Sequence, residues 1–264
     1  MFQYAFYLRL RKEHPLSLFL FDTEKSQSCH WGYELDKVFH IGSIKKARNY
    51  RRLKKYFPKF ESTSRLIQQE NSLKYSDSIL SVQHLCTTYE GFWQSAKYFS
   101  TVEKDVRKTF TFHKDTLKQA NKTLAYQILT SDSPFISVHV RRGDYLQEED
   151  FRGVCSVDYY RKAIEYLTHK VDNPRFIFFS DDIEWVKREF YMDKSVFVDW
   201  NKGDASWQDM YLMTLCSHNI IANSSFSWWG AWLNENTNKI VIAPRRWFLN
   251  SENYDILPED WIKL

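Results

Sequence analysis

The second half of the chain alternates short apolar runs with segments whose apolar residues recur at helical spacing. The runs are rich in Val, Ile and Phe, which is typical of strands buried on both faces of a sheet. Strands that alternate with helices predict βαβ units around a parallel sheet. The five predicted strands are residues 135–140, 175–180, 195–200, 218–223 and 239–244, and the four predicted helices are residues 158–170, 182–190, 206–216 and 224–234.

The first half is less regular and mostly helical in pattern. Its first residues, MFQYAFYLRLRKEHP, have the apolar spacing of an amphipathic helix, but no residue before them could cap it. The turn-rich TSDSP at 130–134 predicts a boundary between domains 1–130 and 131–264. The other predicted elements of this half are a strand at 16–22, a basic helix at 45–57, and one or two helices over 101–112 and 114–129.

Composition excludes several classes of protein. With 43% apolar and 17% aromatic residues among 264, the chain is not disordered, and its net charge of +4 includes no long run of like charge. The longest apolar run, LSLFLF, is far too short to span a bilayer. The cysteines show no zinc-like spacing, so we expect reduced thiols in a cytoplasmic protein: Cys29, Cys86, Cys155 and Cys216.

The stretch HVRRGDY directly follows the first strand of the second half. Arg141 and Arg142 stand where the strand ends, and a guanidinium at such an end is suited to bind a diphosphate through paired hydrogen bonds. His139 would flank the same pocket. The alternative is that both arginines are solvated turn residues and His139 is a core histidine.

The stretch IIANSSFSWWG predicts a strand, a polar turn and the start of a helix. Asn223, Ser224 and Ser225 are all residue types that cap helices, and the free N–H groups of a helix start bind anions. Simple capping is the alternative interpretation. The tryptophans at helical spacing are expected to pack in the core: Trp228, Trp229 and Trp232.

Acidic residues follow two other strands. SWQD fits a capping box with Ser206 as the cap and Asp209 as its partner, although the Asp209 carboxylate could instead contact the edge of a guanine base. Asp181 and Asp182 could be charges at a helix start or pocket residues. The sequence has no P-loop, no intact GxGxxG, no Asp-x-Asp and no HExxH, so we expect any diphosphate to be neutralised by arginines and a helix end without a metal ion.

Taken together, these stretches resemble the α-1,2-fucosyltransferases of bacteria, glycosyltransferase family 11. The resemblance covers nearly the whole chain, and its longest block, with Asn-Ser-Ser-Phe-Ser-Trp-Trp, is specific. It implies an α/β, GT-B-like fold of two Rossmann-like lobes whose parallel sheets face a cleft, with an incomplete N-terminal lobe. The stretches that carry it are HVRRGDY, FIFFSDDIEWVK, WQDMYLMTLCSHNIIANSSFSWWGAWLN, YEGFWQSAKYF, VIAPRRWF and DWIKL.

The resemblance also implies an activity. It is the inverting transfer of L-fucose from GDP-fucose to the 2-hydroxyl of a galactoside in a surface glycan such as an O-antigen, without cofactor or metal. The implied partners are GDP-fucose and a galactose-terminated glycan acceptor, with no nucleic acid. The implied location is the cytoplasm, with peripheral contact to lipid-linked glycans at the inner face of the membrane.

The resemblance also implies a role for each residue that matches a family motif. Arg141 would hold the β-phosphate and stabilise the GDP leaving group, His139 would line the donor site, and Asp209 would contact guanine. Ser224 and Ser225 would present hydroxyl and N–H groups to the diphosphate. The further candidates, as donor-site or fold-holding residues, are Arg142 and Asp144. No residue emerges as the general base.

The sequence departs from the family at its start, where a strand and the turn G-G-L-G-N-Q would precede MFQYA. We expect a start placed too late within a longer natural chain. The alternative is a true truncation, which predicts a non-catalytic or weakly active chain that binds nucleotide sugars. A third class, a basic aromatic nucleic-acid binder, fits less well because the C-terminal half has no basic stripe.

Overall fold

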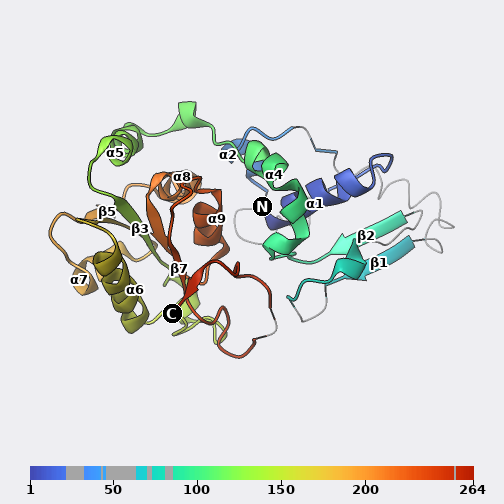
Figure 1. The fold of residues 1–264 in the computed structure, drawn as a ribbon. Helices are drawn as coiled ribbons and strands as arrows, with labels where there is room; N and C mark the ends of the chain where they lie inside the picture. Colours follow the sequence, from blue (N-terminus) through green and yellow to red (C-terminus); the bar gives the residue numbers. More distant parts are fainter. Residues whose placement is uncertain (22–32, 43, 46–63, 70–72, 81–85, 253) are drawn as a thin grey trace. The chain divides into compact units, whose positions relative to one another are not determined.

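A computed structural model describes residues 1–21, 33–42, 44–45, 64–69, 73–80, 86–252 and 254–264. The chain forms two compact units, the first Met1–His113 with Asn253–Pro258 and the second Lys114–Glu252 with Glu259–Leu264. Each unit combines helices with a parallel sheet (Figure 1). The predicted α/β class with parallel sheets is therefore confirmed.

The first unit contains a two-stranded parallel sheet, β1 (Ser64–Gln68) with β2 (Cys86–Glu90). The predicted N-terminal helix is confirmed as α1 (Phe2–Glu13), and its N-cap, Met1, makes no side-chain capping hydrogen bond. The helix predicted over 101–112 is present in part, as the end of η4 (Ala96–Val102) and α4 (Glu103–Thr109). The other helical segments of this unit are α2 (Leu35–Val38) and η3 (Asp77–Ile79).

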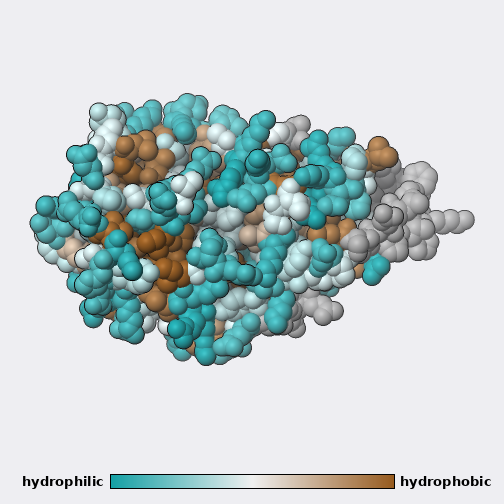
Figure 2. Space-filling model, in the orientation of Figure 1, coloured by the Kyte–Doolittle hydropathy of each residue, from teal (hydrophilic) through white to brown (hydrophobic). Residues whose placement is uncertain are grey.

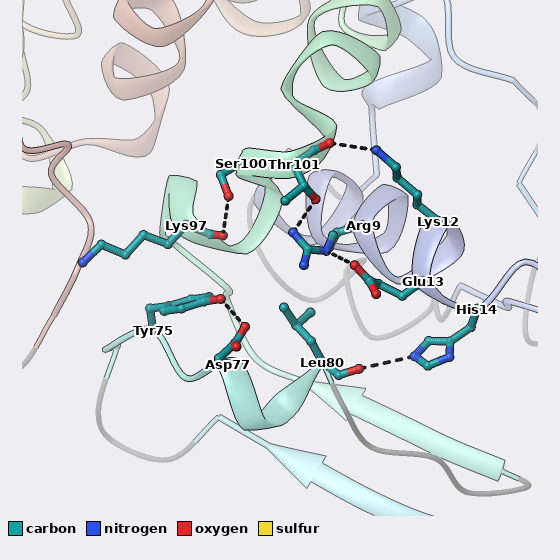
Figure 3. A network of polar contacts seen from close by, with 10 residues as sticks. All are labelled: Arg9, Lys12, Glu13, His14, Tyr75, Asp77, Leu80, Lys97, Ser100 and Thr101. Carbon is teal, nitrogen blue, oxygen red and sulfur yellow. Dashed lines mark hydrogen bonds and ion pairs between the residues drawn. The ribbon is translucent and has the colours of Figure 1, made fainter.

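Polar contacts tie α1 to η4 (Figure 3). Arg9 donates to the Thr101 hydroxyl and forms an ion pair with Glu13 at 2.6 Å, while Lys12 Nζ donates to the Thr101 carbonyl at 2.9 Å. Apolar side chains of α1 are buried against the same part of the unit, with Phe6 stacked on Trp93 at a centroid distance of 4.6 Å and edge-on to Tyr98 of η4. The predicted helix is thus present, but its polar and apolar contacts with η4 are not divided between two faces.

One predicted element of the first unit is wrong. Residues 16–20 form no strand, Phe21 is a bridge residue whose N–H donates to the Lys45 carbonyl at 2.9 Å, and residue 22 lies outside the described residues. Leu16 is fully exposed and Leu18 is 67% exposed, whereas Phe19, Leu20 and Phe21 are partly buried. Its phenylalanines instead pack on α1, with Phe21 stacked on Tyr4. Residues 46–57 of the predicted basic helix lie outside the described residues.

The second unit is built on a six-stranded sheet in the order β5-β4-β3-β6-β7-β8, in which every pair is parallel. All five strands predicted for this half are present, and a short sixth strand joins at the edge. In register, Ile136 of β3 lies between Phe176 of β4 and His218 of β6. The strands are β3 (Phe135–Val140), β4 (Arg175–Ser180), β5 (Val196–Val198), β6 (His218–Ile220), β7 (Val241–Ala243) and β8 (Ile262–Lys263).

Helices cover both faces of this sheet, as the continuous apolar strands predict (Figure 1). The side chains of α6 and α7 pack with Ile136, Val138 and Phe178 on one face. On the other face, α9 packs against α8, where a side chain at Gly230 would crowd Met213. The helices are η5 (Lys114–Thr116), α5 (Gln119–Thr130), η6 (Asp144–Leu146), α6 (Val157–Lys170), α7 (Ile183–Glu189), η7 (Gly203–Ala205), α8 (Trp207–Leu215) and α9 (Ser225–Leu233).

The division between the units differs from the predicted boundary. The turn at 130–134 follows α5, whereas the two compact units divide before it. The reason is tertiary, because α5 packs on α8 and its buried Asn121 bonds to Asn201 and Gln208. A turn signal marks the end of a helix and says nothing about the core on which that helix packs.

The tryptophan prediction is confirmed. Trp228, Trp229 and Trp232 are at most 8% exposed, and the ring of Trp228 lies 5.5 Å from that of Trp261. Figure 2 shows polar residues over most of the visible surface and brown apolar areas on the second unit, one of them over α5, where Leu129 is exposed. No helix among the described residues is long and apolar enough to cross a bilayer.

Candidate functional site

The candidate site lies where the strand order of the second unit reverses. From β3 the chain proceeds to β4 and β5 on one side, and then crosses to β6 on the other side of β3. Open parallel sheets bind ligands at the carboxyl ends of the strands that flank such a switch point. The segments after β3 and β6 meet there, since the Tyr145 hydroxyl donates to the Asn223 carbonyl at 3.3 Å.

Arg141 follows β3 and lies between two carboxylates. Its Nη2 is 2.8 Å from Asp144 Oδ1, and its Nη1 is 3.3 Å from Asp181 Oδ2. The guanidinium also lies 5.4 Å from the centre of the Tyr145 ring. Because a guanidinium carries five N–H donors, these two ion pairs orient it and leave further donors for an anion. The structure thus brings together two residues that were predicted separately for the site, Arg141 and Asp144.

Arg142 makes different contacts. Its guanidinium lies over the Trp185 ring at 3.7 Å, and its Nε donates to Asp182 at 3.1 Å. Asp182 also caps α7 by accepting from the Trp185 N–H at 3.3 Å. Of the two roles predicted for Arg142, this packing supports the fold-holding one.

Asp181 holds the turn that contains Arg141 and Arg142. Its Oδ1 accepts from the Arg142 N–H at 2.9 Å while its Oδ2 pairs with Arg141. Gly143 approaches so closely that a Cβ there would lie 2.6 Å from Asp181 Oδ2. The sequence left two alternatives for Asp181, a charge at a helix start or a pocket residue. In the structure it stabilises the turn that carries the two arginines.

His139 is the last but one residue of β3 and points toward α9. It is 6% exposed, and its ring lies 5.6 Å from that of Phe226. Its Nδ1 is buried and has no hydrogen-bond partner within the described residues. Burial, aided by the positive charge of Arg141, lowers the pKa of His139 to about 3, so the ring is neutral at physiological pH.

The start of α9 lies on the β6 side. Asn223 is anchored by donating to the Trp247 carbonyl at 3.0 Å, and Ser224 caps the helix by accepting from the Phe226 N–H at 3.4 Å. Ser224 is buried whereas Ser225, the first residue of the helix, is exposed. Capping is therefore confirmed for Ser224, and Ser225 is the serine with a hydroxyl open to solvent.

Asp209 lies in the first turn of α8. The expected capping box is wrong, because Ser206 makes no side-chain capping hydrogen bond and Asp209 accepts from Asn201 Nδ2 at 2.7 Å. Burial raises the pKa of Asp209 to about 7, although the Asn201 hydrogen bond and the charge of Lys118 oppose this rise. A half-buried carboxylate held by an amide is available to accept further hydrogen bonds.

Sequence reasoning missed the residues that hold Asp209, namely Asn201 and Asn121. Both are buried, and they exchange hydrogen bonds across 80 residues of sequence. No local pattern could have paired them. Within the residues that the structure describes, no three His, Cys, Asp or Glu side chains gather in a way that could ligate a metal ion.

The six-stranded parallel sheet with polar groups at its switch point defines the second unit as a Rossmann-like α/β domain. Residues 43–264 match the family model described as Glycosyl transferase family 11. The chain belongs to this family.

Named relatives agree with this assignment. Alpha-1,2-colitosyltransferase of Escherichia coli is 34% identical over 100% of this chain and 94% of its own length. O-antigen biosynthesis glycosyltransferase WbnK of Escherichia coli is 35% identical over 66% of this chain and 59% of its own length. Human galactoside alpha-(1,2)-fucosyltransferase 1 is 31% identical over 54% of this chain and 42% of its own length.

Proposed function

We propose that this chain is an inverting transferase that moves L-fucose from GDP-fucose to the 2-hydroxyl of a galactoside in a surface glycan. The observation that carries the proposal lies at the switch point of the second unit, where Tyr145, beside Arg141, donates a hydrogen bond to Asn223 just before the start of α9. Family membership supplies the reaction class, and the names of the relatives favour an α-1,2 linkage.

The proposed chemistry places negative charge on departing GDP as the bond between fucose and phosphate breaks. Arg141 would donate hydrogen bonds to the β-phosphate, where that charge develops. Asp144 and Asp181 orient Arg141 for this task, which limits the reorganisation needed in the transition state.

The start of α9 would bind the same diphosphate through its N–H groups and the Ser225 hydroxyl. His139, neutral and with an unpartnered Nδ1, would line the site, and Asp209 would contact the base. We propose that this arrangement works without a metal ion, as the absence of an Asp-x-Asp motif suggests. Activity that persists in EDTA would support this part.

GDP-colitose is a second candidate donor, because one relative that aligns with the whole chain is named a colitosyltransferase. The decisive assay offers GDP-fucose and GDP-colitose in turn with a β-galactoside and analyses the product by NMR for linkage and anomeric configuration. The proposal expects a sugar on the galactose 2-hydroxyl, with fucose preferred. Preference for GDP-colitose would replace the donor, and GDP binding without turnover would favour the non-catalytic alternative.

Arg141→Ala should lower kcat by about 10² to 10³, as the loss of one transition-state donor does elsewhere. Arg161→Ala, which removes an exposed arginine of α6, is the matched control. Equal activity of the two variants would refute the role of Arg141.

A further inference from the structure

Asp209 rests on a network of buried amides that joins α5, the segment after β5 and α8. Asn121 Nδ2 donates to Asn201 Oδ1 at 2.8 Å, and Asn201 Nδ2 donates back to Asn121 Oδ1 at 3.0 Å. Asn121 Nδ2 also donates to Gln208 Oε1 at 2.5 Å. All three amides are buried.

Two groups that can only donate fix the orientation of these amides. Trp200 Nε1 donates to Asn121 Oδ1 at 2.7 Å, so the oxygen of Asn121 must face Trp200. The Lys118 N–H donates to Gln208 Oε1 at 2.9 Å, so the amide oxygen of Gln208 faces the Nδ2 of Asn121. The orientation of Asn201 follows, with its Nδ2 presented to Asp209.

Asn201 therefore determines how Asp209 is presented. Its Nδ2 donates to Asp209 Oδ1 at 2.7 Å, and this hydrogen bond favours the ionised carboxylate against the effect of burial. Within the described residues, no hydrogen bond is recorded for Asp209 Oδ2. The carboxylate is thus an oriented acceptor with one oxygen anchored.

We propose that Asn201, oriented by Asn121, is the positioning residue that holds Asp209 to accept the N1–H and 2-amino groups of guanine, and so sets the preference for a guanine nucleotide. The inference rests on the proposed function, in which the donor is a GDP-sugar. Adenine offers an acceptor at N1 and no 2-amino group, so it would face the carboxylate with a lone pair. Hypoxanthine offers N1–H alone and should bind with intermediate affinity.

The test measures the affinities of GDP, IDP and ADP by calorimetry for the wild type, Asn201→Ala, Asp209→Ala and the double variant. We expect the wild type to bind GDP about tenfold more tightly than IDP, as one lost hydrogen bond to a charged group predicts. Asn201→Ala should reduce this ratio to about two or less. If Asn201 acts through Asp209, adding Asn201→Ala to Asp209→Ala should change the ratio no further.

Two further variants serve this test. Asn201→Asp is isosteric, keeps an acceptor for Asn121 and replaces the donor to Asp209 by an oxygen, so it should lose the preference even if Asn201→Ala does not fold. Asn238→Ala, at an exposed asparagine, should leave the ratio unchanged.

Each outcome has one meaning. A GDP to IDP ratio that Asp209→Ala lowers and the Asn201 variants leave intact would overturn the inference and spare the proposed function. A ratio that Asp209→Ala also leaves intact would remove Asp209 from base recognition. A wild-type protein that binds no GDP would overturn the proposed function itself.

Discussion

Asp181 accepts a hydrogen bond from the backbone N–H of Arg142 at 2.9 Å, and its other oxygen lies 3.3 Å from Nη1 of Arg141. One carboxylate at the end of β4 thereby fixes the turn that follows β3. The turn carries Arg141, which we propose stabilises the departing GDP. The geometry of the turn should therefore be sensitive to small changes in the position of Asp181.

Gly143→Ala should disturb this turn without unfolding the protein. The new Cβ would lie 2.6 Å from Asp181 Oδ2, so the carboxylate must move away from Arg141. We expect kcat to fall about tenfold, the effect of losing roughly 1.4 kcal/mol of transition-state stabilisation. Gly42→Ala, where a Cβ meets nothing within 4 Å, is the control. Unchanged kcat in Gly143→Ala would show that the position of Asp181 does not matter.

Arg142→Ala should act mainly on stability. It removes a guanidinium that lies 3.7 Å from the centre of the Trp185 ring and an ion pair with Asp182. Urea unfolding should show a loss of roughly 1–2 kcal/mol, and Arg142→Lys should restore only part of it because an ammonium does not stack. A loss of turnover with unchanged stability would place Arg142 in the donor site instead.

Asp209→Asn should stabilise the free protein at alkaline pH. Burial raises the pKa of Asp209 from 3.8 to about 7, so between these values the folded state keeps a proton that the unfolded state has released. Stability from this group therefore falls as pH rises through that window and stays low above it. The variant should gain roughly 1–3 kcal/mol at pH 8 and little at pH 4.

The measurement for Asp209→Asn is urea unfolding across that pH range. Asp204→Asn, at an exposed acid in the same segment, provides the comparison. An equal gain at both pH values would contradict the assignment, since an effect of charge must disappear where the carboxyl is protonated. The same variant should weaken GDP binding, which places stability and function in opposition at this residue.

His139→Phe should separate folding from donor binding. The ring lies beside Phe226, and its Nδ1 is a buried polar atom with no partner in the described part of the chain. Removing such an atom relieves a cost of roughly 1–3 kcal/mol, so thermal unfolding should be unchanged or shifted upward. Calorimetry should show weaker GDP binding. Undiminished affinity would make His139 a core residue only.

Ser224→Ala and Ser225→Ala should divide capping from anion binding. Ser224 accepts the hydrogen bond that caps α9, and its loss should lower stability by about 0.5–1 kcal/mol. Ser225 is exposed, so its loss should change stability by less than about 0.5 kcal/mol while GDP affinity falls about tenfold. Equal affinities in the wild type and Ser225→Ala would leave the N–H groups of α9 as the only anion contact at this end.

The order of elements in the second unit could be predicted, because each of its strands and helices has a recognisable pattern of apolar residues within a short stretch of sequence. Phe135–Val140 is buried throughout, as its mostly apolar and β-branched sequence predicts, although Ser137 and His139 are buried with it. The strand prediction failed for residues 16–20 because an apolar run does not reveal whether its side chains are buried, and Leu16 and Leu18 lie in solvent. The predicted end of α5 was correct. Its membership of the second unit, however, depends on hydrogen bonds from Asn121 to Asn201 and Gln208, which lie far along the chain.

The sequence by itself determined the parallel α/β class, the core role of the tryptophans and the residues that stand at strand ends. These follow from local spacing and from the rule that parallel strands share a carboxyl edge. Only the tertiary structure decided which of those residues meet. Arg141 lies between Asp144 and Asp181, and Arg142 stacks on Trp185. Asp209 accepts a hydrogen bond from Asn201 in place of the expected capping contact with Ser206. Such choices depend on distances between segments that are remote in sequence, and spacing along the chain carries no information about them.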